Sequence, residues 1–136
     1  MQREESGPIL LIGNYPPDRQ QSMLRFGSMM LEGLAAAGVR AELIQPLPLL
    51  GKFGAAGAFV AKWLAYADKF IFFPRRLQAR LRRSPAPALV HICDHSNAMY
   101  TEQVRGIPVV VTCHDLLAVR GALGDETDTP ASRTGK

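Results

Sequence analysis

Short apolar runs alternate along the chain with longer segments in which apolar residues recur every three or four positions. Four runs rich in Ile, Leu and Val are bounded by turn signals, at residues 8–13, 39–44, 90–93 and 109–113. Continuous apolar runs of this length are typical of strands buried in a parallel sheet. The pattern therefore predicts four strands separated by helices.

Three helices are expected between and after these strands. The first begins near Asp18, after paired prolines, and ends at Gly38. Its apolar residues lie at helical spacing and make it amphipathic: Met23, Phe26, Met30, Leu31 and Leu34. The second runs from Ala58 to Arg83, and Pro74 should kink or split it. A short third helix is expected over Asn97–Arg105, capped by Ser96 or Asn97.

This alternation predicts an α/β fold: a doubly wound, Rossmann-like parallel sheet with helices on both faces. Right-handed crossovers place the second strand on one side of the first, and the third and fourth strands on the other. The strand order reverses between strands one and three. We expect a Rossmann-like domain over residues 1–120, a loop over Gly51–Gly57 and a polar tail over 121–136.

Polar and titratable residues follow the predicted strands where ligands bind in open α/β sheets, beyond the carboxyl ends. Asn14 and Tyr15 follow the first strand, and Arg19 lies on the same loop. The third and fourth strands end in the most informative residues: Asp94, His95, His114 and Asp115. His91 lies inside its strand and is expected to be a satisfied core histidine. Together these residues predict a site at the switch point between strands one and three.

Composition excludes several classes of protein. A hydrophobic fraction of 47% and a charged fraction of 21% are those of a globular protein rather than a disordered one. The two cysteines lack the spacing of a disulfide framework or a structural zinc site, and both are expected to be small core residues. The polar start of the chain shows no signal peptide, so a cytoplasmic location is expected.

A metal site is the competing interpretation of the strand ends. Six residues there supply ligand types for zinc or iron: Cys93, Asp94, His95, Cys113, His114 and Asp115. Adjacent residues on a strand point to opposite faces, so only some of the six can converge. We therefore expect no metal.

Positive charge is concentrated in one segment. Residues 46–90 carry eight Lys or Arg and one acid, or +7, within a chain of net charge +4. A basic element of this kind indicates an anionic partner, and no nucleic-acid recognition motif accompanies it. We expect a membrane surface to contact aromatic and basic residues of the long helix: Phe70, Phe72, Phe73, Arg75, Arg76, Arg80, Arg82 and Arg83. The alternative is a core-packing helix with a solvated basic end. Charges at Lys62, Asp68 and Lys69 exclude a transmembrane span.

Several motifs resemble those of one enzyme family. They are Gly13-Asn14-Tyr15-Pro16-Pro17, the helix end Leu31-Glu32-Gly33-Leu34 to Gly38-Val39, and the third strand Leu89-Val90-His91-Ile92 to His95. The most specific is Pro108-Val109-Val110-Val111-Thr112-Cys113-His114-Asp115-Leu116. Together they resemble the amino-terminal part of a family 4 retaining glycosyltransferase of the GT-B architecture.

The resemblance implies a hexosyl-type transferase that moves a sugar from a nucleotide-sugar to a carbohydrate or lipid-linked acceptor, without metal or other cofactor. The chain would be the acceptor-side domain, apparently truncated and inactive without a donor-binding domain. His114 would orient and stabilise the reacting sugar, and Asp115 would hold the loop. The remaining contacts would come from Asn14, Tyr15, Arg19, Asp94 and His95. A cytoplasmic protein, peripheral on the inner face of the membrane, is expected. The alternative is a non-catalytic α/β module that binds a membrane or a partner.

Overall fold

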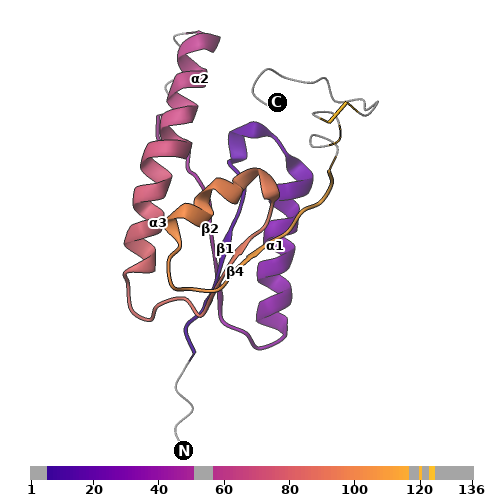
Figure 1. Cartoon of the computed structure of the whole chain (residues 1–136), viewed down its shortest axis with the longest axis vertical. Helices are drawn as coiled ribbons and strands as arrows, with labels where there is room; N and C mark the ends of the chain where they lie inside the picture. Colours follow the sequence, from indigo (N-terminus) through magenta and orange to yellow (C-terminus); the bar gives the residue numbers. More distant parts are fainter. Residues whose placement is uncertain (1–5, 51–56, 117–119, 121–122, 125–136) are drawn as a thin grey trace, which may run out of the picture.

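Four parallel strands form one sheet that has helices on both faces (Figure 1). The computed structural model describes residues 6–50, 57–116, 120 and 123–124. The sheet has the order β2-β1-β3-β4, from strands β1 Ile9–Ile12, β2 Ala41–Ile44, β3 Leu89–Ile92 and β4 Val109–Val111. The predicted α/β class and strand order are confirmed. The fold is consistent with a Rossmann-like arrangement, and the strand order reverses between β1 and β3.

The helices lie in two layers. Helix α1 (Gln21–Ala36) lies on one side of the sheet, and the long helical segment lies on the other (Figure 1). That segment consists of α2 (Ala58–Ala67), the π-helical turn η3 (Asp68–Phe72) and α3 (Phe73–Leu81). Two 3₁₀ elements complete the described fold, η1 (Pro16–Asp18) and η4 (His95–Gln103).

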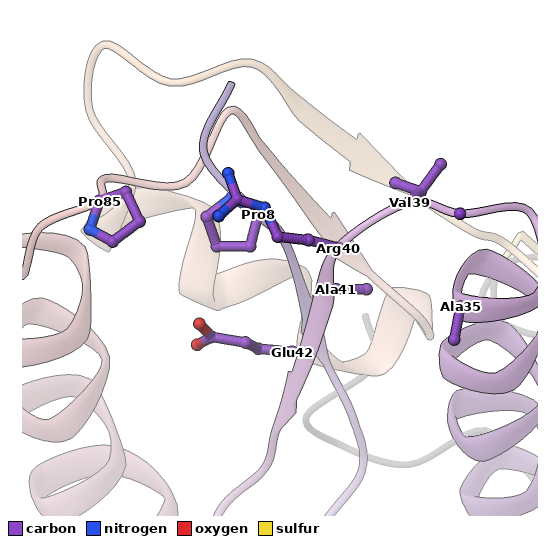
Figure 2. Close-up of a pocket in the computed structure, with 8 residues that line it drawn as sticks. Pro8, Ala35, Val39, Arg40, Ala41, Glu42 and Pro85 are labelled. Atoms are coloured by element: carbon purple, nitrogen blue, oxygen red, sulfur yellow. The ribbon is translucent and has the colours of Figure 1, made fainter. Parts of the chain in front are cut away.

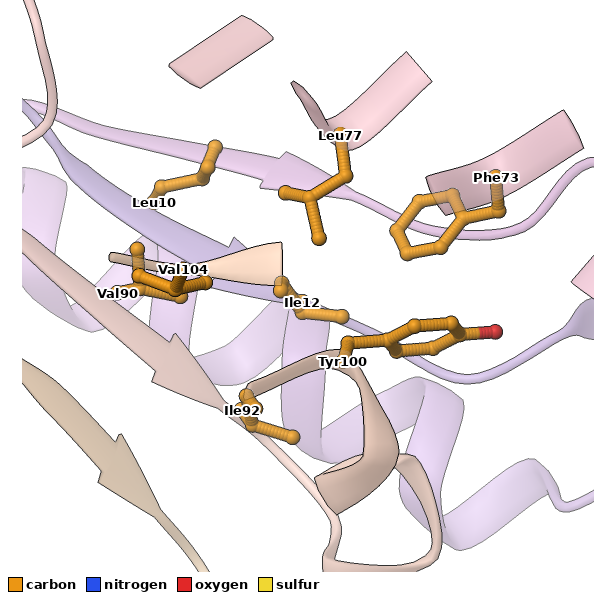
Figure 3. Close-up of a cluster of buried hydrophobic side chains, with 8 residues drawn as sticks. All are labelled: Leu10, Ile12, Phe73, Leu77, Val90, Ile92, Tyr100 and Val104. Atoms are coloured by element: carbon orange, nitrogen blue, oxygen red, sulfur yellow. The ribbon is translucent and has the colours of Figure 1, made fainter. Parts of the chain in front are cut away.

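The main hydrophobic core lies between the sheet and the layer of α3 and η4 (Figure 3). Alternate strand residues point into it because successive side chains on a strand face opposite ways. Its buried members are Leu10, Ile12, Phe73, Leu77, Val90, Ile92, Tyr100 and Val104. The rings of Phe73 and Tyr100 meet edge to face with centroids 4.7 Å apart, an arrangement that adds to area burial.

The opposite face of the sheet packs on α1 through a glycine. A Cβ added at Gly27 would lie 3.6 Å from Leu43 Cδ1, at ordinary van der Waals contact. Gly27 is the residue of α1 that is buried, whereas the other residues of this helix keep part of their surface exposed. The amphipathic pattern predicted for this helix thus corresponds to a shallow contact.

Pro74 changes the long helix without ending it. The Phe73 N–H donates to the carbonyl of Asp68, five residues earlier, as in a π-helix. The carbonyl of Lys69 would next require an N–H from residue 74, which proline lacks. The hydroxyl of Tyr100 donates to that carbonyl instead, at 3.0 Å. The predicted break at Pro74 is therefore a π-helical turn whose orphan carbonyl is satisfied by another element.

Several local predictions are corrected. The prolines begin the 3₁₀ turn η1, because a proline at the first positions loses no needed donor. The first predicted helix begins at Gln21 rather than near Asp18, and its N-cap is Gln20. The helix after β3 is 3₁₀ and begins at His95, and its cap is Asp94 in place of Ser96 or Asn97. The predicted loop 51–57 lies, up to residue 56, outside the described residues, as does most of the predicted tail 121–136.

Strand β4 is less buried than its apolar sequence predicts. Val110 and Val111 are exposed, and so is Cys113, which was expected in the core. The reason is position: β4 lies at the sheet's edge and pairs only with β3 in the described part of the chain. Cys93, after the central strand β3, is buried as predicted.

Two neighbouring phenylalanines test the packing of the long helix. Phe73 is 1% exposed and Phe72 is 38% exposed. We expect Phe73→Ala to lower the free energy of unfolding by about 3–5 kcal/mol, because it leaves a cavity in the core. Phe72→Ala is the matched control and should change it by about 0.5 kcal/mol or less. Urea unfolding curves measure both, and equal losses would contradict the assignment of Phe73 to the core.

Candidate functional site

A buried polar network joins the carboxyl ends of β1 and β3. Asn14, two residues after β1, donates from Nδ2 to Asp94 Oδ2 at 2.7 Å and to Gln20 Oε1 at 2.6 Å. Asn97 Nδ2 donates to Asn14 Oδ1 at 3.0 Å. The Ser96 hydroxyl donates to Asp94 Oδ2 at 2.6 Å. The predicted meeting of Asn14 and Asp94 at the switch point is thus what the structure shows.

This network is satisfied within the protein. Both polar atoms of the Asn14 amide are used, and Asn14, Asp94 and Asn97 are buried. Burial alone would raise the pKa of the Asp94 carboxyl. Hydrogen bonds from Ser96 and Asn14, with the nearby His95, nevertheless hold that pKa below its ordinary value. Asn14 and Asp94 were expected to contact acceptor, and in the structure both side chains are buried and hydrogen-bonded to their neighbours.

His95 is partly exposed, and the network residues Gln20 and Ser96 are exposed as well. The His95 side chain is 35% exposed, and its Nδ1 lies 3.2 Å from Asp94 Oδ1. That contact lacks hydrogen-bond geometry, so the buried Nδ1 has no hydrogen-bond partner among the described residues. An imidazole held beside a carboxylate and open to solvent can bind a hydroxyl or an anion. His95 is therefore the best-placed ligand contact of the network.

A second polar cluster, next to the first, was missed by the sequence analysis. Asp68 on η3 is fully buried and accepts hydrogen bonds from the Tyr15 hydroxyl and the Leu50 N–H, both at 3.0 Å. Burial, and then the bond to Asp68, raise the pKa of Tyr15 to about 12. Lys69 lies 5.0 Å from the centre of the Tyr15 ring and forms an ion pair with Asp18. Asp68 thereby fastens the loops after β1 and β2 to the long helix, and Tyr15, predicted as a ligand contact, is buried in that fastening.

The sequence contains a signal that could have identified Asp68 as a buried residue. It is the single acid among the nine charged residues of segment 46–90 and follows an apolar helix. A lone carboxylate in such a setting is stable only when it is paired or hydrogen-bonded, which marks it as a buried anchor.

His114 follows β4, which lies next to β3, one of the two strands that carry the polar network. Its Nε2 lies 2.8 Å from the carbonyl oxygen of Cys93, so this nitrogen carries the proton and donates. The ring of Phe26 on α1 meets the imidazole edge to face at 4.7 Å. Asp115, which was expected to hold the loop, is exposed, and its carbonyl accepts from the Cys113 thiol at 3.1 Å. His114 is thus oriented by the backbone that follows β3 and by the ring of Phe26.

His91 lies in the core, and Arg19 lies on the surface. His91 is buried, and its Nε2 lies 2.7 Å from Thr112 Oγ1, which confirms a satisfied core histidine. Burial lowers the pKa of His91. Arg19 is exposed and has a positive φ of 55°, and its backbone N–H closes the 3₁₀ turn on Pro16. Arg19 lies on the loop between β1 and α1, which also carries Asn14.

The residues expected to meet a membrane are divided by the structure. Phe70 and Phe72 are exposed, whereas Phe73 is buried in the core, and the prediction for Phe73 is therefore wrong. Arg80 makes a bidentate ion pair with Glu42, at 2.6 and 2.8 Å, which lowers the pKa of Glu42. Arg76 donates to the carbonyl of Gln45. The exposed arginines also include Arg75, Arg82 and Arg83.

A cavity of about 610 Å³ lies at the opposite, amino-terminal edge of the sheet (Figure 2). It is lined by Pro8, Ala35, Gly38, Val39, Arg40, Ala41, Glu42 and Pro85. Because none of the predicted site residues lines this cavity, it is separate from the network. Within the described residues, no group of three or more His, Cys, Asp or Glu is arranged to hold a metal ion.

Comparison of the chain with protein-family models, curated proteins and solved structures finds no match. Its class is thus defined by the observed α/β fold with an all-parallel sheet. In the described part of the chain, no helix has both the length and the apolar character needed to cross a membrane.

The network predicts acid sensitivity. Because the pKa of Asp94 is lowered in the folded protein, its contribution to stability is present above about pH 4 and is lost as the pH falls through the folded pKa. Asp94→Asn should cost about 1–3 kcal/mol at pH 7, since an acceptor of several hydrogen bonds is replaced.

The same substitution should reduce the loss of stability between pH 5 and pH 2. The measurement is urea unfolding across that range, with Glu32→Gln, an exposed change on α1, as the control. An unchanged acid dependence in Asp94→Asn would show that the network does not stabilise the carboxylate.

Proposed function

We propose that this chain is the acceptor-side domain of a retaining GT-B glycosyltransferase, which transfers a sugar from a nucleotide-sugar to a carbohydrate or lipid-linked acceptor. One observation carries the proposal: a buried polar network lies where the strand order reverses, and His95 and His114 border it. Ligands of open α/β sheets bind at such a point. Three of the four stretches that resemble the family include or directly follow the ends of β1, β3 and β4, and the fourth covers the end of α1.

The geometry suggests a division of roles. Asn14, Asp94 and Asn97 would hold the carboxyl ends of β1 and β3 together. The partly exposed His95 would bind an acceptor hydroxyl. His114, oriented by the carbonyl of Cys93, would help to orient and stabilise the reacting sugar. The donor would be held by a second domain. A cytoplasmic location, peripheral on the inner face of the membrane, belongs to the same proposal.

A non-catalytic α/β binding module is the second candidate. It is favoured by the completeness of the network, because Asn14 and Asp94 are satisfied without any ligand. Substrate-binding groups commonly keep an open hydrogen-bonding position. The glycosyltransferase candidate predicts that a substitution of His114 affects turnover, whereas the binding module predicts no turnover at all.

The first expected outcome concerns the chain by itself. Purified alone, it should transfer no sugar from any common nucleotide-sugar, because the proposal assigns donor binding to another domain. The measurement is release of nucleotide from a panel of UDP-, GDP- and ADP-sugars in the presence of mixed acceptors. Turnover by the 136-residue chain would overturn this division of labour.

The second concerns His114 in a polypeptide that joins this domain to its donor-binding domain. His114→Ala should lower kcat by about tenfold to a thousandfold, as the loss of a preorganised polar group does. Cys113→Ala, at the exposed neighbouring position, is the matched control and should leave kcat unchanged. Unaltered kcat in His114→Ala would make this histidine a structural contact of β3 and move the reacting site toward His95.

A further inference from the structure

Helix α2 is apolar and yet unburied. Its sequence, residues 58–67, contains one charged side chain, Lys62, and none of its residues is buried. Four aromatic residues follow one another along α2 and η3: Phe59 is 75% exposed, Trp63 59%, Tyr66 40% and Phe70 55%. Large contiguous apolar surfaces of this kind mark interaction sites in folded proteins.

These four residues, here called the aromatic stripe, form one continuous surface. Their spacing of four, three and four residues places them on one helical face. Successive rings are in contact, with centroids 6.2 Å apart for Phe59 and Trp63, 5.9 Å for Trp63 and Tyr66, and 5.8 Å for Tyr66 and Phe70. The stripe is therefore an ordered apolar face.

The charges around the stripe are basic and indicate an anionic partner. Lys62 lies 5.7 Å from the centre of the Tyr66 ring, at the border of the stripe. Asp68 is the single acidic residue between 57 and 83, and it is fully buried. The exposed charge of the long helical segment is consequently basic. Tyr and Trp beside basic side chains are the composition of a helix that lies in the interface of an anionic membrane.

We propose that the aromatic stripe docks on the surface of an anionic lipid bilayer, with α2 lying in the plane of the headgroups. The apolar rings would enter the acyl boundary, and Lys62 and Arg75 would contact lipid phosphates. This surface replaces the one expected from the sequence, because Phe73 belongs to the core and Arg80 is held by Glu42. A second copy of the chain is disfavoured, because symmetric pairing of two stripes would bring like charges together.

The direction of α2 gives this surface a functional meaning. In Figure 1, α2 extends beyond the carboxyl ends of the strands, the end that carries Asn14, Asp94 and His95. Docking through the stripe would therefore bring the lipid surface to the same end of the molecule as the polar network.

Trp63 allows a direct test because it is the single tryptophan of the chain. The purified chain is titrated with vesicles of phosphatidylcholine and phosphatidylglycerol, and with vesicles of phosphatidylcholine alone. We expect a blue shift of Trp63 emission and quenching by brominated acyl chains with the anionic vesicles only. Added salt should weaken binding, because exposed charges are screened.

Three double variants separate binding through the stripe from nonspecific adsorption to lipid. Phe59→Ser with Phe70→Ser keeps Trp63 as the probe and should lower the partition coefficient by about tenfold or more, since apolar area is lost. Val110→Thr with Val111→Thr removes exposed apolar surface at β4 and should leave partitioning unchanged. Lys62→Gln with Arg75→Gln should reduce both the binding and its dependence on salt.

Three outcomes would overturn the proposal. They are equal binding to neutral and anionic vesicles, Trp63 emission that does not respond to lipid, and a lipid-free dimer in sedimentation equilibrium that the stripe variant abolishes. No readout requires sugar transfer, so each outcome is independent of the proposed glycosyltransferase activity.

Discussion

The proline at position 74 is the constraint on which much of this structure depends. A helix interior that lacks one N–H must either end or rearrange, and here it rearranges into the π-helical turn η3. The turn leaves the carbonyl of Lys69 to the Tyr100 hydroxyl, which ties the long helix to η4. The same turn holds Asp68 inside, where it receives Tyr15 and Leu50. The missing hydrogen bond is thus compensated by Tyr100, and the Asp68 carboxylate of the same turn binds two further parts of the chain.

Strand positions and sheet order were accessible from the sequence because both follow from local patterns. Apolar runs bounded by turns locate the strands, and right-handed crossovers fix their order. The choice between Phe72 and Phe73 was not accessible, because a π-helical turn shifts the phase of all later residues and a regular helical period no longer applies. The exposure of β4 was missed because its apolar run was interpreted as a buried strand, although the predicted strand order already places this strand at the edge of the sheet.

The candidate site shows the same division. The chain order of the strands brings Asn14 and Asp94 together, and this could be predicted. Which polar atoms satisfy one another could not, because Ser96 and Asn97 reach the network from η4 and Gln20 reaches it from the start of α1. Because the buried residues hydrogen-bond to one another, they hold the carboxyl ends of β1 and β3 together. His95 and His114 remain as groups that can contact a ligand.

The pairing of Asn14 with Asp94 also has a consequence for how the protein folds. These residues are 80 positions apart in the chain, and β1 pairs with β3 over a comparable distance. Closing such a loop costs about 2 kcal/mol more in chain entropy than closing a loop of ten residues. Parallel sheets with distant pairings form slowly for this reason. During synthesis, β1 and β2 are complete long before β3 leaves the ribosome, and the central edge of the sheet stays open in the interval. The polar network cannot assemble until Asn97 has emerged.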